Sequence, residues 1–201
     1  MAYRKFTYAK LKNELGIIDI SQLLFADIEP IEPAKWLTNL LKVAKPFAYF
    51  SEKSRSEAIV FPVLLFLNEY NQQSFSIYSG AELPADEEKG LSGECDFILG
   101  AGQQRLHVDS PLFCMVEAKD ESIKNAIPQC IAQMEGARIY NEKQGKPQSV
   151  MYGCATTGVE WQLLKLENNI AYVDTERYYL ATLPTLLGAL QSVLKAYQVQ
   201  R

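Results

Sequence analysis

The chain has 201 residues, 48% of them hydrophobic, and a formal net charge of −4 at pH 7. This length suffices for one substantial core, so we expect a single domain over residues 1–201, and the acidic balance argues against a general nucleic-acid binder because Lys and Arg contacts to phosphates supply most non-specific affinity. No apolar run reaches the roughly 18 residues of a membrane span, and no apolar segment with a cleavage site follows the first basic residues, so we expect a cytoplasmic protein without membrane contact.

The first half of the chain predicts mainly helices. Short helices are expected near residues 8–15 and 33–44, separated by a connection at residues 27–33 that contains two prolines. A long helix is expected from about residue 54 to 70. Within it, Pro62 is expected to kink the helix or to split off its first turn, because proline lacks the N–H group that a helix interior uses.

The second half of the chain predicts strands and helices in alternation. The expected strands are residues 74–78, 93–99, 112–119 and 149–156, then a hairpin of 161–166 with 170–173, and the expected helices are 122–143 and 183–197. Gly100 to Pro111 carries two glycines and a proline, which indicates the turn of a hairpin.

Together these elements predict an α/β fold, more closely an α+β mixed sheet flanked by helices. Its core has the order helix, three strands, helix, strand, over about residues 51–158. An N-terminal helical extension over residues 1–50 precedes this core, and a hairpin with a final helix over residues 159–201 follows it.

Two acids and a lysine stand near the ends of two neighbouring predicted strands. Side chains two apart in a strand point to the same face, so Glu117 and Lys119 of the sequence VEAK lie side by side. The apolar run of residues 112–116 predicts a strand buried on both faces, and charge at its end is costly unless it is paired or metal-bound. Asp96 precedes the apolar half of the strand before. If these strands pair, Asp96, Glu117 and Lys119 converge on one site.

Spacing alone is weak support for such a site. The chain contains a second Glu-x-Lys triplet, Glu87 to Lys89, inside the sequence PADEEKG, where proline, glycine and consecutive charges indicate a solvated loop. Context distinguishes Glu117 and Lys119 from this second triplet, because an apolar strand precedes them, an acid lies on the preceding strand, and a helix follows.

The order of a helix-borne glutamate, an Asp on one strand, Glu-x-Lys on the next and a glutamine on the following helix resembles the PD-(D/E)XK nuclease superfamily, the restriction-endonuclease-like fold. More narrowly, the stretches SEKSRSEAIVFPVLLFL, FSIYSG, GLSGECDFILG, VEAKD and IPQCIAQMEGA resemble a group of uncharacterised bacterial, often cyanobacterial, proteins placed in that superfamily. The resemblance covers residues 51–158, about half of the chain. The proline of the superfamily's name is absent, since Glu94 and Cys95 precede Asp96, as in many other members.

The resemblance implies a metal site with a catalytic lysine. Asp96 and Glu117 would bind Mg²⁺, or Mn²⁺ in its place, with the backbone carbonyl of Ala118 as a further oxygen ligand. Lys119 would orient the attacking water or stabilise developing charge.

The resemblance also implies two supporting residues on helices. Glu57 matches the helical glutamate and would hold a metal-bound water or a second ion. Gln129 matches the glutamine that follows the motif, and Gln133 lies one helical turn later on the same face.

The chemistry is plausible without the family name. Mg²⁺ takes oxygen ligands and usually keeps several waters, so one or two carboxylates suffice to anchor it beside a phosphate. A lysine flanked by carboxylates stays charged. His107 is the only histidine, and four cysteines lie scattered in apolar segments without zinc-ligand spacing, so we expect reduced core cysteines and no zinc site.

Each candidate also has a structural interpretation. Glu57 lies three residues after Ser54, which is the spacing of a capping box. Lys119, with the acids at 120 and 121, fits a charged strand end that enters a helix. Gln129 and Gln133 fit the polar edge of an amphipathic helix, and Glu94, on the same strand face as Asp96, fits either a supporting acid or an exposed residue.

Charge distribution bears on the function more than net charge does. Nine basic residues surround the proposed site in sequence, and they form either a local basic rim or an ordinary mixed surface. They are Lys42, Lys45, Lys53, Arg55, Lys119, Lys124, Arg138, Lys143 and Lys146. Acids such as Glu29, Glu32 and those of the loop at 86–88 lie away from the site.

These observations predict a Mg²⁺-dependent phosphodiesterase, a nuclease that acts on nucleic acid and in the first place on DNA. The alternative is a catalytically inactive module of the same fold, for nucleic-acid binding or protein assembly, and an enzyme of unrelated fold would require the candidate residues to lie far apart.

Six tyrosines are candidates to stack on bases, to fill a homodimer interface or to be half-buried structure. They are Tyr3, Tyr8, Tyr49, Tyr78, Tyr178 and Tyr179.

Overall fold

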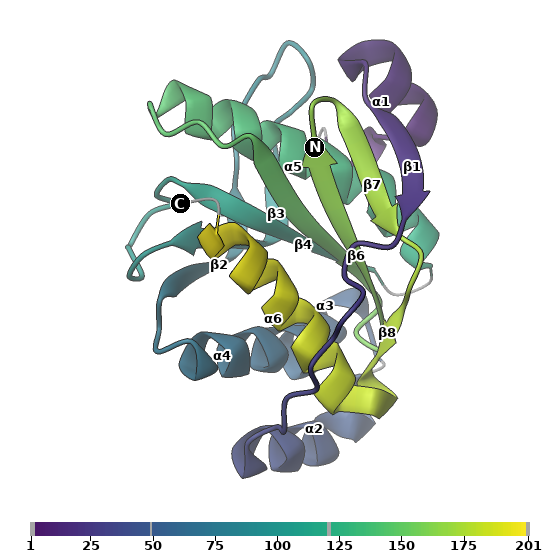
Figure 1. Ribbon diagram of the computed structural model, residues 1–201, viewed down its shortest axis with the longest axis vertical. Coiled ribbons are helices and arrows are strands. Elements are labelled where there is room, and N and C mark those ends of the chain that lie inside the picture. Colours follow the sequence, from purple (N-terminus) through teal and green to yellow (C-terminus); the bar gives the residue numbers. More distant parts are fainter. Residues whose placement is uncertain (1–2, 49, 120–121, 200–201) are drawn as a thin grey trace.

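The computed structural model describes residues 3–48, 50–119 and 122–199. It is a mixed α/β structure in which an eight-stranded sheet of parallel and antiparallel strands is flanked by helices (Figure 1). In spatial order the strands are β1 (Ile18–Gln22), β7 (Ile170–Asp174), β6 (Glu160–Glu167), β5 (Val150–Thr156), β4 (Leu112–Ala118), β3 (Glu94–Ala101) and β2 (Phe75–Glu82), and β8 (Tyr178–Tyr179) pairs with β6.

The predicted core order of helix, three strands, helix and strand is present. Strands β2, β3 and β4 form an antiparallel meander, and the chain then crosses through helix α5 (Ile123–Lys143) to β5, which pairs parallel to β4. A parallel neighbour requires such a crossover, whereas antiparallel strands need only a turn. Because β4 and β5 lie in the middle of the sheet, every residue of both strands is buried, as the apolar run before Glu117 predicted.

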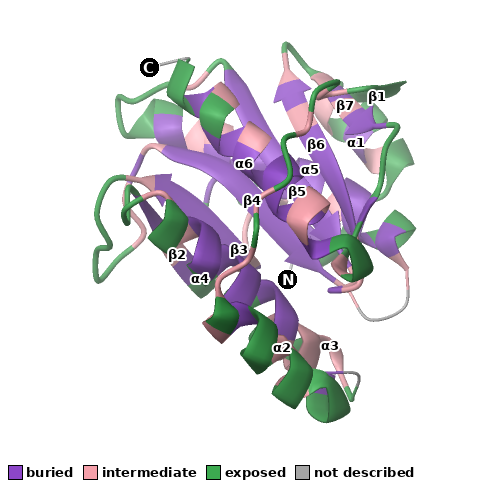
Figure 2. Cartoon of the chain, turned by 60° about the horizontal axis from the view of Figure 1, so that its bottom comes forward, coloured by how far each residue is buried: buried purple, intermediate pink, exposed green. Residues whose placement is uncertain are grey.

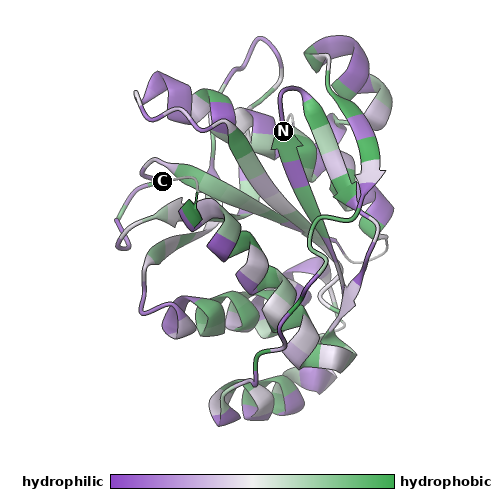
Figure 3. Cartoon of the chain, viewed as in Figure 1, coloured by the Kyte–Doolittle hydropathy of each residue, from purple (hydrophilic) through white to green (hydrophobic). Residues whose placement is uncertain are grey.

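Helices cover both faces of the sheet and enclose two hydrophobic clusters. Helix α5, with α1 (Tyr8–Leu15) and the 3₁₀ turn Tyr3–Lys5 beside it, packs on one face, where Ile98, Met115 and Met134 are buried together. Helices α4 (Phe61–Tyr70) and α6 (Leu183–Val199) pack on the other face over Phe97 and Trp161. Burial concentrates along the central strands, and the hydrophilic positions lie mainly in loops and on outer helix faces (Figures 2 and 3).

The long helix before the sheet has three parts. It begins as α3 (Glu52–Arg55), passes through a π-helical turn at Ser56–Val60, and continues as α4. Pro62 lies in the first turn of α4, directly after the π-helical turn. Because proline lacks an N–H and its ring crowds the preceding helical carbonyls, a local change of hydrogen-bond spacing accommodates it. The expected split at Pro62 is therefore a change of helix type within one continuous helix.

Several boundaries differ from the sequence prediction. Helix α2 (Lys35–Ala48) continues through Pro46 instead of ending near residue 44. Strand β1, which pairs parallel to β7, was not predicted, because its five residues are all exposed and the short segment carries no buried face. The terminal hairpin β6–β7 is present, with Asn168 and Asn169 at positive φ in its turn, as suits a tight two-residue connection.

The cysteines are free and buried, as expected. Cys95 and Cys114 lie on adjacent strands but belong to the hydrophobic clusters on opposite faces of the sheet, so the pair is not placed for a bridge.

Among the six candidate tyrosines, Tyr3, Tyr78 and Tyr178 are buried, and only Tyr8 and Tyr179 are described as exposed. Tyr49 lies outside the described residues. None of the helices traced in residues 3–199, the gaps excepted, is long and apolar enough to cross a membrane.

Gly188 is expected to be the least replaceable residue of α6. A Cβ atom there would collide with the backbone carbonyl of Glu29, where the connection to α2 crosses the helix. Overpacking of this kind typically costs about 1–3 kcal/mol. Gly188→Ala should therefore lower the free energy of unfolding by that amount and shift the urea midpoint downward, whereas Gln198→Ala, at an exposed position of the same helix, should leave the midpoint nearly unchanged. Equal midpoints for both variants would contradict the close backbone contact.

Candidate functional site

The candidate site lies where β3 and β4 separate. The hydrogen-bonded register of the two strands begins at Phe97 opposite Val116, and Asp96 is the next residue beyond it on β3. Its carboxylate reaches across to β4, where Oδ2 accepts a hydrogen bond from the backbone N–H of Ala118 at 2.7 Å. The Asp96 side chain thus continues the connection between the strands after the backbone ladder has ended.

Glu117 is held from both sides. It is only 3% exposed, and its Oε1 lies 2.7 Å from Lys119 Nζ. Its Oε2 accepts a hydrogen bond of 2.6 Å from Nε2 of Gln133, on α5. Strand alternation predicted the side-by-side placement of Glu117 and Lys119, and the ion pair agrees with it. A buried carboxylate with a cation and an amide donor satisfies the requirement that buried charge be paired.

Lys119 has a second acidic partner that the sequence reasoning missed. Glu52 Oε1, from the first turn of α3, lies 3.3 Å from Lys119 Nζ. The ammonium therefore sits between Glu52 and Glu117 and is mostly buried, with 13% of its side chain exposed. Glu52 directly follows Ser51, whose side chain caps the helix, so the acid at the first helical position was the available signal.

Burial and charge together set the protonation of the site. Burial and the nearby Glu117 carboxylate raise the pKa of Asp96 to about 7, although the Ala118 hydrogen bond and Lys119 act in the opposite direction. Burial disfavours the charged form of Lys119, but Glu117, Asp96 and Glu52 outweigh burial, and the pKa of the ammonium is raised. Lys119 therefore stays charged, whereas burial and the Glu117 carboxylate disfavour the charged form of Asp96.

A cleft of about 430 Å³ opens beside Asp96. Its charged lining residues are Arg4, Glu52, Lys53, Glu57, Glu94 and Asp96. Glu57 thus borders the same cleft as Asp96, but its side chain is 67% exposed and its carboxylate lies 3.6 Å from Lys53 Nζ. The capping box suggested for Ser54 and Glu57 is wrong, because Ser51 is the N-cap and accepts from the N–H of Ser54. Glu94 lines the cleft as well, but its side chain is exposed, so the supporting-acid and exposed-residue interpretations both remain.

The two glutamines of α5 have different surroundings. Gln133 contacts Glu117, whereas Nε2 of Gln129 faces the backbone carbonyl of Arg4 at 3.5 Å. Gln129 lines a separate hollow of about 580 Å³ that Arg4, Lys119 and Lys124 also border. Both glutamines lie on the same side of the helix, as expected, but only Gln133 lies level with Glu117. Gln133, which the sequence analysis named as one turn later on the same face, is thus the amide that contacts Glu117, and Gln129 borders a hollow together with Lys119.

Fewer basic residues border the site than the nine that surround it in sequence. Arg138 is paired with Glu135 on its own helix, and Lys143 and Lys146 donate to the carbonyls of Ala85 and Ser110. A 21-residue helix is about 30 Å long, so the end of α5 is remote from the site at its beginning. The bases that border the two hollows are Arg4, Lys53, Lys119 and Lys124.

A metal ion would have few ligands from the protein. Oδ1 of Asp96 accepts no hydrogen bond from the described residues, whereas both oxygens of Glu117 already have partners. Within those residues no group of three or more His, Cys, Asp or Glu side chains has an arrangement that could hold a metal. Asp96, Glu117 and the carbonyl of Ala118 remain the candidates, and they suit an ion that keeps most of its waters. The acids at 120 and 121 lie outside the described residues.

Comparison of the chain with protein-family models and with curated proteins gives no match. The family resemblance therefore continues to rest on the motifs themselves, and the function has to be argued from the site.

Proposed function

We propose that this protein is a metal-dependent nuclease that hydrolyses phosphodiester bonds of nucleic acid, with DNA as the first substrate to test. The observation that carries the proposal is the lysine held between Glu117 and Glu52 at the edge of a strand pair, with the carboxylate of Asp96 on the neighbouring strand. Two acids can anchor an oxygen-liganded cation beside a phosphate, and a charged lysine can stabilise the negative charge that develops during phosphodiester hydrolysis.

Each residue has a separate part in this proposal. Asp96 supplies Oδ1, which accepts no hydrogen bond from the part of the chain that the structure describes, and Glu117 and the Ala118 carbonyl complete the set that would hold Mg²⁺ or Mn²⁺. When bound, the ion would neutralise phosphate oxygens and lower the pKa of a coordinated water. Lys119 stays protonated and can orient water or stabilise negative charge near the phosphate. Gln133 and Glu52 are positioning residues, since they contact Glu117 and Lys119 respectively.

The test is hydrolysis by the purified chain. Single- and double-stranded DNA and RNA are incubated with the protein and Mg²⁺, Mn²⁺ or EDTA, alongside Glu117→Gln. The loop triplet offers a matched control, because Glu87→Gln makes the same change in an exposed Glu-x-Lys sequence. Metal-dependent cleavage that Glu117→Gln abolishes and Glu87→Gln retains supports the proposal. Cleavage that survives in Glu117→Gln would show that the activity belongs to another site.

Gln133 is expected to matter more than Gln129. Removing the amide in Gln133→Ala frees one oxygen of the buried Glu117 and loosens its orientation, and such supporting contacts to metal ligands are typically worth about 10- to 100-fold in affinity or activity. Gln129→Ala should change either quantity less than about twofold. Initial rates of cleavage and a Mg²⁺ titration of each variant measure the difference. The reverse order of effects would restore the role that the motif implies for Gln129.

One observation favours the second candidate, an inactive module of the same fold for binding or assembly. Both oxygens of Glu117 are already paired with groups of the protein, so this carboxylate is satisfied without an ion. Calorimetry with Mg²⁺ separates the two candidates. Heat of binding that is lost in Asp96→Asn supports the nuclease, and absence of binding together with absence of cleavage supports the module.

A further inference from the structure

A second hollow adjoins the cleft beside Asp96. It has a volume of about 610 Å³, and Phe61, at the start of α4, lines both spaces. Strand β2 is shared in the same way, since Ser79 lines the cleft and Ile77, two residues earlier on the same face, lines the second hollow. Helix α4 and β2 lie side by side in Figures 1 and 2. A ligand that reaches the cleft can therefore extend past Phe61 into the second hollow.

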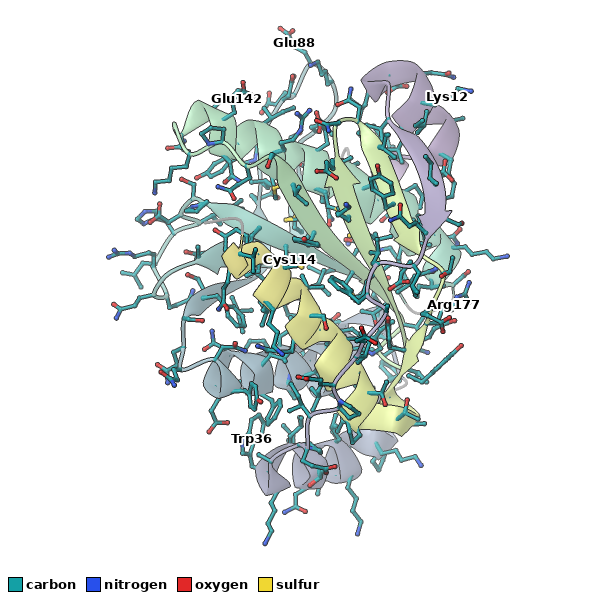
Figure 4. The ribbon with its side chains drawn as sticks, viewed as in Figure 1. Lys12, Trp36, Glu88, Cys114, Glu142 and Arg177 are labelled. Atoms are coloured by element: carbon teal, nitrogen blue, oxygen red, sulfur yellow. The ribbon has the colours of Figure 1, made fainter. Side chains whose placement is uncertain are left out.

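The second hollow combines amide and apolar side chains, and none of the described residues that line it carries a charge. Its amides are Asn68, Gln72, Gln73, Gln103 and Gln104, and its apolar residues are Phe61, Leu65, Phe75 and Ile77. Glu69 of the same helix borders a neighbouring space, where its carboxylate accepts a hydrogen bond of 2.7 Å from Nε1 of Trp36, labelled in the lower part of Figure 4. Arg105 faces Asp109 at 4.0 Å. The hollow thus suits an uncharged group with several hydrogen-bonding atoms.

Three of the five amides are available to a ligand. The side chains of Asn68 and Gln104 are tied to backbone groups of β2. Those of Gln72, Gln73 and Gln103 make no hydrogen bond within the part of the chain that the structure describes. Each free amide offers one carbonyl acceptor and two N–H donors. The hollow therefore has fixed walls and a set of unused donors and acceptors.

Gln72 and Gln73 are held in a backbone conformation that favours glycine. Both φ angles are 56°, in the left-handed region. A glutamine is strained there, whereas a glycine adopts this conformation without steric cost. The turn that follows α4 would accept glycine at both positions, so its geometry does not account for the two side chains. Contact of these amides with a ligand in the hollow does.

Phe61 presents an aromatic surface between the cleft and the second hollow. Its ring stacks on Phe97 at a centroid distance of 6.3 Å and an interplanar angle of 15°, and the residue is still 38% exposed. Phe97 is buried in β3 and follows Asp96 directly in the sequence, so its contact fixes the Phe61 ring on the wall that leads to the candidate metal ligand. A ring held in this way can stack on a planar ligand group.

We propose that the hollow beyond Phe61 receives an unpaired nucleobase of the strand whose phosphate lies at Asp96. The base stacks on Phe61 and hydrogen-bonds to the three free amides. This inference rests on the proposed nuclease function and names its substrate class as unpaired strands. A base is an uncharged planar group with donors and acceptors along its edges, and Asn and Gln side chains are suited to pair with such edges. In a duplex the base faces are stacked and the pairing edges are occupied, so only an unpaired base can enter.

The test compares strands with and without bases. Fluorescence anisotropy gives the affinity of the full chain for a labelled oligothymidine, and competition gives its affinity for an abasic oligomer of the same length and for a duplex, in EDTA and in Ca²⁺. The two single strands carry the same phosphates, so the ratio of their affinities reports on base contacts alone. We expect the wild type to bind oligothymidine about tenfold more tightly than the abasic oligomer, and the duplex more weakly than oligothymidine.

Two variants remove the proposed base contacts. Phe61→Ala is expected to weaken oligothymidine binding about tenfold and to leave binding of the abasic oligomer unchanged. Gln72→Gly with Gln73→Gly is expected to weaken oligothymidine binding about 2- to 10-fold. The glycine pair relieves backbone strain, so its urea midpoint should stay close to that of the wild type. A loss of binding in the glycine pair therefore cannot be a loss of folding.

Matched controls make similar changes outside both hollows. Phe47→Ala removes another exposed ring, and Gln144→Ala with Gln198→Ala removes two exposed amides, so all three changes should leave the affinity ratio as in the wild type. Equal wild-type affinity for oligothymidine and the abasic oligomer, or no single-strand binding in either buffer, would overturn the inference. So would a preference for oligothymidine that both Phe61→Ala and the glycine pair leave unchanged. Duplex binding as tight as oligothymidine binding, and equally sensitive to Phe61→Ala, would overturn the requirement for an unpaired base.

The failure of the inference differs from the failure of the nuclease proposal, because the binding measurement needs no hydrolysis. Base-dependent binding that Phe61→Ala abolishes, in a wild type that cleaves no nucleic acid, would overturn only the nuclease proposal. Metal-dependent cleavage that Glu117→Gln abolishes, together with binding that is indifferent to Phe61, would overturn only the base subsite.

Discussion

Lys119→Met is expected to reduce hydrolysis about 10²- to 10³-fold and to destabilise the fold. The first effect follows because a charged group near the phosphate is lost from a largely water-excluded position, where such groups are worth most. The second follows because Glu117, 3% exposed, would lose its cation, and breaking a buried pair from one side typically costs about 3–5 kcal/mol. Single-turnover cleavage at saturating Mg²⁺ and urea unfolding measure the two effects.

Two variants separate chemistry from stability in this prediction. Lys53→Met removes a lysine that lines the cleft beside Asp96, but from an exposed pair with Glu57, so both quantities should change little. Lys119→Arg keeps the positive charge and should recover most of the stability, while its planar guanidinium cannot take the same position between Glu52 and Glu117. Full activity in Lys119→Arg or Lys119→Met would exclude a catalytic role for the lysine.

The strand part of the site could be predicted because it depends on local periodicity. The apolar run of β4 specifies a central strand, and the period of two then places Glu117 beside Lys119 whatever the rest of the chain does. The pairing of β3 with β4 follows from one hairpin turn. For these reasons Asp96 could be assigned to the neighbourhood of Glu117 from sequence alone.

The helical part of the site could not be predicted in the same way. Glu52 and Glu57 are five residues apart, and the π-helical turn at Ser56–Val60 changes the rotation per residue between them and the rest of the helix. A count based on 3.6 residues per turn therefore does not tell which acid faces Lys119. Glu52 is the acid that pairs with Lys119 because of how α3 lies relative to the end of β4. This placement joins residues that are far apart in the sequence, so local spacing does not determine it.

Strand β1 illustrates a second limit. Its partner β7 lies about 150 residues further along the chain, and its own residues are exposed, so no local pattern marks it. The position of Gln133 depends on similar information, because the level of α5 relative to Glu117 is set by the whole crossover from β4 to β5. Spacing could identify the face of the helix but not the turn that reaches the carboxylate.

Asp96→Asn is expected to abolish metal-dependent hydrolysis and, unlike Lys119→Met, to stabilise the metal-free protein at neutral and alkaline pH. The amide is nearly isosteric, and its oxygen can still accept from the N–H of Ala118. The substitution removes the negative charge that burial and Glu117 disfavour. The variant therefore loses a metal ligand, and it also loses the unfavourable interaction of that charge with its surroundings. Opposite stability changes for two substitutions in one site would be the signature of a cluster organised for a cation.

The sign of the pH dependence follows from the raised pKa of Asp96, about 7 in the folded protein against roughly 3.9 in an unfolded chain. Well below pH 4 the group is protonated in both states and brings no penalty. Between pH 4 and 7 the unfolded state releases the proton first, so wild-type stability falls, by an amount that reaches about 2–4 kcal/mol above pH 7. Asp96→Asn should therefore unfold at a higher temperature than wild type at pH 8 and at nearly the same temperature at pH 4. Saturating Mg²⁺ should narrow the difference at pH 8, because only the wild type retains the carboxylate to bind it. A constant difference across this pH range would mean that Asp96 ionises normally and that the cluster does not need a cation.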